Sequence, residues 1–222
     1  MKHKLKAIIW DFDGTIADTQ KMHAKTEVQT LKKYGIKISE HEITQRFAGV
    51  KLSVIFKTLF DENNITTGYL ESRKIKWKMV DKIISKTAPK FMPGVKKLFR
   101  ECKKQNIIMA IASSSIKSYL DRAINKMGIQ KLFEVVVSGN DVRLGKPNPE
   151  IFIKTMKLLK ISNKECIVIE DGNAGVIAAQ KAKIKCIAVG DHIDKSIIKK
   201  TSMYVDSLKK LNLNFIKKYF GF

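Results

Sequence analysis

Two acidic residues separated by one position follow the first apolar segment of the chain, residues 7–10. Successive side chains of an extended chain point to opposite sides, so Asp11 and Asp13 lean toward the same point while Phe12 turns inward. Two neighbouring carboxylates repel each other unless a cation intervenes or one keeps a proton, and both states serve catalysis. An Asp-Gly turn at a strand end is common, but the order apolar segment, Asp, aromatic, Asp, Gly, Thr is more specific. It predicts a catalytic or metal-binding pair.

A lysine stands between a glycine and a proline in the segment 145–150. Asn148 suits the N-cap of a following helix, Pro149 its first position and Glu150 its first turn. Lys146 is therefore expected on a stiff turn with its ammonium held in one direction. Most lysines are instead solvated surface groups.

Three serines, residues 113–115, follow the apolar segment 107–112 and precede a helical pattern that stops at Gly128. A serine in this place is a good helix N-cap. The same hydroxyl can also bind a ligand, so the two roles coexist.

A second pair of acids, Glu170 and Asp171, follows the apolar segment 167–169. Gly172 and Gly175 beside them allow a tight turn and a close approach of the backbone. With the first pair, up to four negative charges would crowd one cleft. A hard, oxygen-binding cation resolves that conflict, so the pattern favours a metal site over a plain acidic turn.

The elements that position these residues alternate between short apolar runs and helical patterns. The expected strands cover residues 7–10, 107–112, 135–137, 167–169, 186–189 and 203–205. Near-continuous apolar strands alternating with helices are typical of a parallel sheet covered on both faces. We therefore predict a Rossmann-like, doubly wound α/β fold, whose ligands bind beyond the carboxyl ends of the strands.

One interval breaks this alternation, because residues 16–89 show only helical patterns with polar breaks. The simplest interpretation is an inserted all-α cap domain at 16–89, with an α/β core domain formed by 1–15 and 90–222.

These motifs, in this order, resemble those of the haloacid dehalogenase superfamily, in particular its Mg²⁺-dependent phosphatases and the β-phosphoglucomutase group with a helical cap. The resemblance covers the whole chain. It implies a nucleophile at Asp11, a general acid and base at Asp13, and a Lys146 that stabilises the phosphoryl charge. It implies phosphate binding by Ser113, with Ser114 as the alternative. It also implies Mg²⁺ held by Asp11, the main-chain carbonyl of Asp13 and Asp171, with Glu170 assisting directly or through water.

The chemistry of the residues agrees with these implied roles. A carboxyl of ordinary pKa, about 3.9, is ionised at neutral pH, so Asp11 would need no base to become a nucleophile. Asp13 would have to carry a proton when the alcohol leaves and lack one when water attacks.

Other substrate-contacting residues are expected around the first turn and in the insertion. Gly14 and Thr15 follow the aspartate pair, and residues 46–51 resemble the substrate loop of the cap. In that loop Gly49 permits close approach, and Arg46 or Lys51 is a candidate for a distal anionic group; each of these cations is otherwise a surface group. His23 matches a position that some mutases place near the leaving group, although a lone helix histidine is more often structural.

The composition of the chain argues against nucleic-acid-binding, membrane and secreted proteins. The formal net charge is +22 with 43 Lys+Arg, but the lysine pairs are scattered, without aromatic interleaving, which argues against a nucleic-acid partner. No apolar run approaches the ~18 residues of a membrane span. Because the sequence shows no signal-peptide pattern, we expect a cytoplasmic protein. We take a monomer as the default expectation for its oligomeric state. Three cysteines without paired spacing predict buried free thiols.

The primary hypothesis is a Mg²⁺-dependent phosphatase that hydrolyses a small phosphorylated metabolite through an aspartyl-phosphate intermediate. One alternative is a phosphomutase of the β-phosphoglucomutase type, although Thr15 resembles the phosphatases more. Another is a basic nucleic-acid-binding module without enzymatic activity. Phosphoglycolate, hexose phosphates and nucleoside monophosphates all stay open as substrates.

Overall fold

The centre of the molecule is a six-stranded parallel sheet. In the computed structural model, which describes residues 4–199 and 201–222, the strand order is β3-β2-β1-β4-β5-β6. The strands are β1 (Ala7–Trp10), β2 (Ile108–Ala112), β3 (Val135–Val137), β4 (Cys166–Glu170), β5 (Lys185–Val189) and β6 (Met203–Val205). Ile9 of β1 lies opposite Ala110 and Val168 on its two neighbours. The doubly wound α/β prediction is confirmed.

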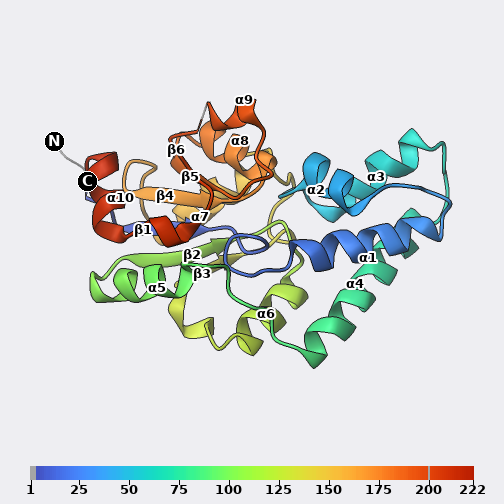
Figure 1. Cartoon of the computed structure of the whole chain (residues 1–222), viewed down its shortest axis with the longest axis horizontal. Coiled ribbons are helices and arrows are strands. Elements are labelled where there is room, and N and C mark those ends of the chain that lie inside the picture. The colour runs from blue at the N-terminus through green and yellow to red at the C-terminus, as the bar shows by residue number, and fades with distance from the viewer. Residues whose placement is uncertain (1–3, 200) are drawn as a thin grey trace.

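Helices cover both faces of this sheet, as Figure 1 shows for α5 and α6 on one side and α8 and α9 on the other. The first layer contains α5 (Val95–Lys104), α6 (Lys117–Lys126) and α10 (Leu213–Phe220). The second contains α7 (Glu150–Leu159), α8 (Asn173–Lys181) and α9 (Lys195–Ile198), and short 3₁₀ turns lie at η1 (Gln130–Leu132) and η2 (Leu208–Lys210).

The alternation along β1 explains why the sheet needs two helical layers. Ile8 and Trp10 join one hydrophobic cluster, while Ala7 and Ile9 join another on the opposite face. All four side chains are buried. A strand that is apolar on both sides is stable only between two layers.

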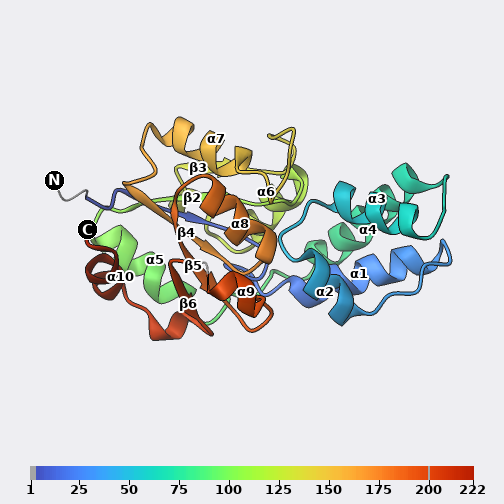
Figure 2. The ribbon, with the colours of Figure 1, turned by 90° about the horizontal axis from the view of Figure 1, so that it is seen from above.

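Four helices form a separate lobe beside the sheet, seen at the right of Figure 2. They are α1 (Gln20–Lys32), α2 (Glu40–Phe47), α3 (Leu52–Glu62) and α4 (Tyr69–Lys86). Their apolar faces enclose a core of their own, which includes Leu31, Ile43, Phe56 and Phe60. This is the inserted helical cap, and we keep residues 16–89 as its proposed extent.

The two chain segments that join the lobes are hydrogen-bonded to each other. The amide of Asp18 donates to the carbonyl of Lys90, and the amide of Met92 donates to the carbonyl of Ile16. This pairing holds the start of α1 next to the end of β1. The cap is thereby anchored beside the carboxyl edge of the sheet.

The three cysteines, Cys102, Cys166 and Cys186, are buried and unpaired, as the sequence predicted. Burial raises the pKa of Cys102 and of Cys166 to about 12. These thiols are therefore core residues without nucleophilic character at neutral pH. None of the helices in the described part of the chain is long and apolar enough to cross a membrane.

Candidate active site

The carboxyl ends of three neighbouring strands bring the predicted residues together. Asp11 follows β1, Ser113 follows β2, and Glu170 is the last residue of β4. Because β1 lies between β2 and β4, these side chains meet at the edge where parallel sheets bind ligands. Asp11 and Glu170 are almost completely buried.

Lys146 reaches the same point from the loop before α7. Its Nζ donates to Asp11 Oδ1 at 2.6 Å, to Glu170 Oε2 at 2.7 Å and to the carbonyl of Ala112 at 3.0 Å. Burial by itself would lower the pKa of Lys146, but Asp11 and Glu170 outweigh it and raise that pKa above its ordinary value. The buried group is therefore a stable ammonium.

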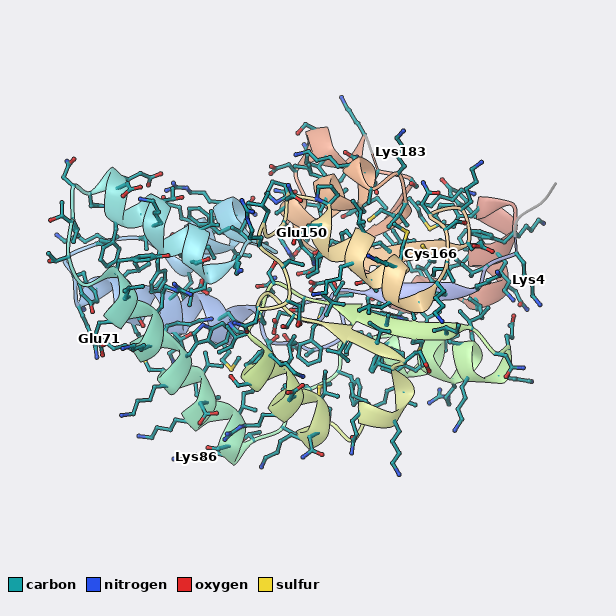
Figure 3. The ribbon with its side chains drawn as sticks, turned by 180° about the vertical axis from the view of Figure 1, so that it is seen from behind. Lys4, Glu71, Lys86, Glu150, Cys166 and Lys183 are labelled. Carbon is teal, nitrogen blue, oxygen red and sulfur yellow. The ribbon has the colours of Figure 1, made fainter. Side chains whose placement is uncertain are left out.

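The loop that carries Lys146 is tied to the start of α7, where Figure 3 labels Glu150. The carboxylate of Glu150 accepts hydrogen bonds from the amides of Arg143 and Leu144. The side chain of Asn148 accepts a hydrogen bond from the amide of Glu150 at 3.0 Å. The helix begins at Glu150 with Pro149 as its N-cap residue, one position later than expected. The hydrogen bonds of Asn148 and Glu150 still order the turn around the lysine.

Three carboxylates form a group with the donor chemistry of a hard cation site. Oxygens of Asp11, Glu170 and Asp171 all lie within 4.8 Å of one another. Burial, and then the charge of Glu170, hold the pKa of Asp11 well above its ordinary value, although Lys146 opposes the rise. One ammonium does not balance three buried carboxylates, and all-oxygen donors suit Mg²⁺. The residues fit the implied metal.

This pKa corrects the expectation that Asp11 has an ordinary carboxyl pKa. The sequence argument used the value of a solvated group, whereas desolvation and a like-charged neighbour both disfavour the ionised form. In the protein alone, the carboxyl group of Asp11 is therefore held partly back from ionisation. A cation in the carboxylate group would lower this pKa and favour the nucleophilic form.

Asp171 is contacted from three directions, by two hydrogen-bond donors and by the imidazole of His192. Thr15 Oγ1 donates to its Oδ1 at 2.9 Å, Gln20 Nε2 donates to its Oδ2 at 2.8 Å, and His192 Nε2 lies 3.2 Å from Oδ2. Gly14 has φ +87°, and a Cβ there would lie 2.0 Å from Asp171 Oδ2. Gly14 and Thr15, expected to contact substrate, are thus placed against Asp171, because the turn after β1 folds back toward β4.

Thr15→Val tests whether this orientation matters for the metal. The variant keeps the shape but leaves Asp171 Oδ1 without its buried donor. Partners of metal ligands typically contribute about 10–100-fold in affinity or activity, so we expect about tenfold weaker binding of Mg²⁺, measured by calorimetry. Thr155→Val is the matched control, since Thr155 is also buried but donates within α7 to Ile151. Unchanged Mg²⁺ affinity in Thr15→Val would contradict the inference that Thr15 positions Asp171 for the metal.

Asp13 accepts hydrogen bonds on both carboxylate oxygens. Tyr119 and Thr19 donate to Oδ1 at 2.6 and 2.7 Å, His23 Nε2 lies 3.0 Å from the same atom, and Ser115 donates to Oδ2 at 2.6 Å. Burial works to raise the pKa of Asp13, but His23 and the hydroxyl donors outweigh it and hold that pKa well below its ordinary value. In this state Asp13 is ionised.

Ser113 and Ser114 have different hydrogen-bond partners, one within the serine turn and one in the cap. Ser113 Oγ accepts a hydrogen bond from the amide of Ser115, and Ser114 Oγ donates to the carbonyl of Gly49 at 2.6 Å. Gly49 has φ +80°, and a Cβ there would come within 3.4 Å of Glu170 Oε1. The loop around Gly49 therefore joins the cap directly to the edge of the core that carries the candidate site.

A pocket lies between the two lobes above Asp11 and Asp13. The cap side is lined by apolar and polar side chains: Ala24, Glu27, Ile43, Thr44, Phe47, Val50, Leu52, Ile55, Lys76 and Trp77. His23 also lines it, between Asp13 and the Lys76 ammonium, which lies 2.8 Å from His23 Nδ1.

The structure does not bring Arg46 or Lys51 into this pocket. Arg46 lies on the outer side of α2, where it is paired with Glu42 and Glu62. Lys51 Nζ donates to the carbonyl of Val142 at 3.3 Å. Each cation has a nearby acceptor outside the pocket, and neither residue lines it.

Several residues around Asp13 and Asp171 were not identified from the sequence. Ser115 directly follows the two serines named as phosphate-binding candidates, and Tyr119 lies in the first turn of α6, which begins at Lys117. Both residues come soon after β2, and this closeness to the carboxyl edge of the sheet could have suggested them. Gln20, Glu27 and Lys76 have no local signal, since their partners are distant in the chain.

Residues 8–189 match the family model of haloacid dehalogenase-like hydrolases, and the chain therefore belongs to this family of enzymes. The resemblance seen in the motifs is confirmed.

Its relatives include both phosphatases and mutases. The chain is 27% identical to the β-phosphoglucomutase of Bacillus subtilis over 192 residues, 84% of each protein. It is 28% identical to the phosphorylated carbohydrates phosphatase of Thermotoga maritima, over 82% of this chain and 84% of that one. It is 28% identical over 96% of its length to the chloroplastic protein SUPPRESSOR OF QUENCHING 1 of Arabidopsis thaliana, of which it spans only 21%. The crystal structure of a β-phosphoglucomutase from Clostridium difficile matches with a TM-score of 0.86 and 25% identity, covering 97% of both chains.

Proposed function

We propose that this enzyme is a Mg²⁺-dependent phosphomonoesterase that hydrolyses a small phosphorylated metabolite through a phosphorylated Asp11. The observation that carries the proposal is the buried contact of 2.6 Å between Asp11 and the Lys146 ammonium, at the base of a pocket that also contains Asp13. A fixed ammonium beside a carboxylate stabilises the charge that develops during phosphoryl transfer.

Two half-reactions use the aspartate pair. In the first, the Asp11 carboxylate attacks phosphorus, the bond from phosphorus to the ester oxygen breaks, and Asp13 gives its proton to that oxygen. In the second, water attacks the phosphorus of the aspartyl phosphate, Asp13 takes the proton of the water, and phosphate leaves Asp11. Asp13 is then protonated again, as at the start of the first half.

The surroundings of Asp13 suit both halves. Its pKa, held well below the ordinary value, keeps the carboxylate ionised in the free site, and the ionised form is the one that can take a proton in the second half. A phosphate dianion bound beside it adds a negative charge, which raises a carboxyl pKa and favours the protonated form needed in the first half. The contact between Ser114 and Gly49 closes the cap over the pocket and limits access of bulk water.

The metal would be held by Asp11, Glu170, Asp171 and the main-chain carbonyl of Asp13. When bound, Mg²⁺ neutralises charge on the phosphoryl oxygens and on the nearby carboxylates. Lys146 acts on the same charge from the protein side, and Thr15 and Gln20 hold Asp171 in place for the cation.

The experiment is a screen for phosphate release from a panel of phosphorylated metabolites, with Mg²⁺ and with EDTA. We expect release that EDTA abolishes and added Mg²⁺ restores. Absence of Mg²⁺-dependent release from every ester would overturn the proposal. If the protein then bound nucleic acid with a steep salt dependence, the third hypothesis would replace it.

A phosphomutase is the second candidate, since β-phosphoglucomutases are among the relatives. A mutase shares the first half-reaction but returns the phosphoryl group to a second hydroxyl of the substrate. Phosphorus NMR of β-glucose 1-phosphate with the enzyme separates the two candidates. Inorganic phosphate supports the phosphatase, and accumulation of glucose 6-phosphate supports the mutase.

A further inference from the structure

A buried ion pair lies on the cap side of the pocket. Glu27 of α1 and Lys76 of α4 place Oε1 and Nζ 3.3 Å apart, with side chains that are 7% and 2% exposed. The ammonium also contacts His23 Nδ1 at 2.8 Å and lies 3.8 Å from the centre of the Trp77 ring. All four residues line the pocket above Asp13.

The remainder of this cap wall offers no compensating positive charge. Apart from Gln20 and Thr44, which are polar but uncharged, the side chains are apolar: Ala24, Ile43, Phe47, Val50, Leu52 and Ile55. Among the described residues that line the pocket, Lys76 is the sole lysine or arginine. Because Glu27 already neutralises it, the cap side of the pocket has no ammonium left to pair with a ligand.

The pairing of Glu27 with Lys76 affects which leaving groups suit the pocket. An anionic group entering beside Glu27 would be desolvated against apolar walls and repelled by that carboxylate. An uncharged, hydroxylated group instead donates hydrogen bonds to Glu27 or Thr44 and lays its apolar face on Trp77 or Phe47. The wall therefore suits a neutral alcohol.

We propose that Glu27 is a specificity-determining residue that restricts this enzyme to phosphate monoesters with an uncharged leaving group. Because Glu27 pairs with the Lys76 ammonium, that ammonium does not bind a second phosphate or a carboxylate of the substrate. Substrates with such a group are therefore excluded. The inference rests on the proposed phosphomonoesterase function. It disfavours phosphoglycolate as substrate, and it disfavours a mutase cycle, in which a bisphosphate must occupy the same pocket.

The first test uses wild-type enzyme and pairs of esters that differ by one anionic group. Glycerol 3-phosphate is compared with 3-phosphoglycerate, and glucose 6-phosphate with glucose 1,6-bisphosphate, by kcat/KM for phosphate release with Mg²⁺. We expect the uncharged member of each pair to be preferred by about tenfold or more, a difference of ~1.4 kcal/mol per tenfold. Equal kcat/KM within the pairs, or a preference for the anionic member, would overturn the inference and leave the phosphatase intact. No release from any ester would overturn both.

The second test changes the ion pair. Glu27→Gln keeps the shape and frees the ammonium, so kcat/KM for the anionic member should rise about tenfold relative to its uncharged partner. Glu27→Gln/Lys76→Gln should lose this gain, because the freed charge is gone. Glu71→Gln is the matched control, since Glu71 lies on the outer edge of the cap in Figure 3 and is exposed; its selectivity should equal that of wild type.

An unchanged selectivity in a folded Glu27→Gln variant would overturn the role of Glu27. So would a gain that persists in the double variant. Circular dichroism establishes that each variant is folded, and the wild-type comparison decides the charge preference even if Glu27→Gln fails to fold.

Discussion

Lys146→Met is expected to abolish phosphate release and to lower the free energy of unfolding by about 3–5 kcal/mol, the typical cost of removing one partner from a buried ion pair. The ammonium is completely buried and contacts Asp11, Glu170 and the carbonyl of Ala112. Methionine fills much of the volume but leaves two carboxylates without a counter-charge. Chemical denaturation in EDTA measures the stability, and phosphate release with Mg²⁺ measures the activity.

A second substitution separates the two effects. Glu170→Gln added to Lys146→Met removes one of the stranded carboxylates, so part of the lost stability should return while activity stays absent. Lys86→Met is the control, because Lys86 is exposed at the end of α4 (Figure 3) and should change the stability by less than ~1 kcal/mol. A Lys146→Met variant as stable and active as wild type would contradict the assigned role of the ammonium.

Asp11→Asn is expected to abolish turnover of p-nitrophenyl phosphate and yet to raise the melting temperature of the metal-free enzyme. The amide is a far weaker nucleophile than a carboxylate, so no phosphorylated enzyme forms. It also removes a buried negative charge beside Glu170 and Asp171. A gain of ~1 kcal/mol corresponds to about 2–4 °C for a chain of this size.

The pH dependence of this gain has a definite sign. Burial and the charge of Glu170 hold the pKa of Asp11 above its unfolded value in the folded state. The folded state therefore binds this proton more tightly, and ionising Asp11 costs folding free energy once the pH exceeds the unfolded value of about 3.9. In EDTA, the difference in melting temperature between Asp11→Asn and wild type should grow as the pH rises from about 4 to neutral.

Added Mg²⁺ should reverse the comparison. It stabilises wild type by binding the folded state, and it should stabilise Asp11→Asn much less because one ligand has lost its charge. Asp121→Asn, an exposed residue paired with Lys117, is the control and should respond to Mg²⁺ as wild type does. Retained turnover in Asp11→Asn would exclude Asp11 as nucleophile.

The sequence alone determined the sheet and the positions of the charged motifs along it. Strands such as residues 7–10 are apolar on both sides, and this pattern requires two covering layers regardless of distant contacts. The sites after such strands must share one edge when the strands are parallel neighbours. For this reason the convergence of Asp11, Lys146 and Asp171 could be predicted from local signals.

Only the tertiary structure decided the partners of side chains on different helices. Arg46 pairs with acids on the outer side of the cap, while Lys76 enters the pocket and meets Glu27 from another helix. The pKa of Asp11 also depends on the tertiary structure, because desolvation and the charges at the end of β4 set it. Local pattern fixes which face of a helix is apolar, but the charge of a pocket is a sum over elements whose packing no single segment encodes.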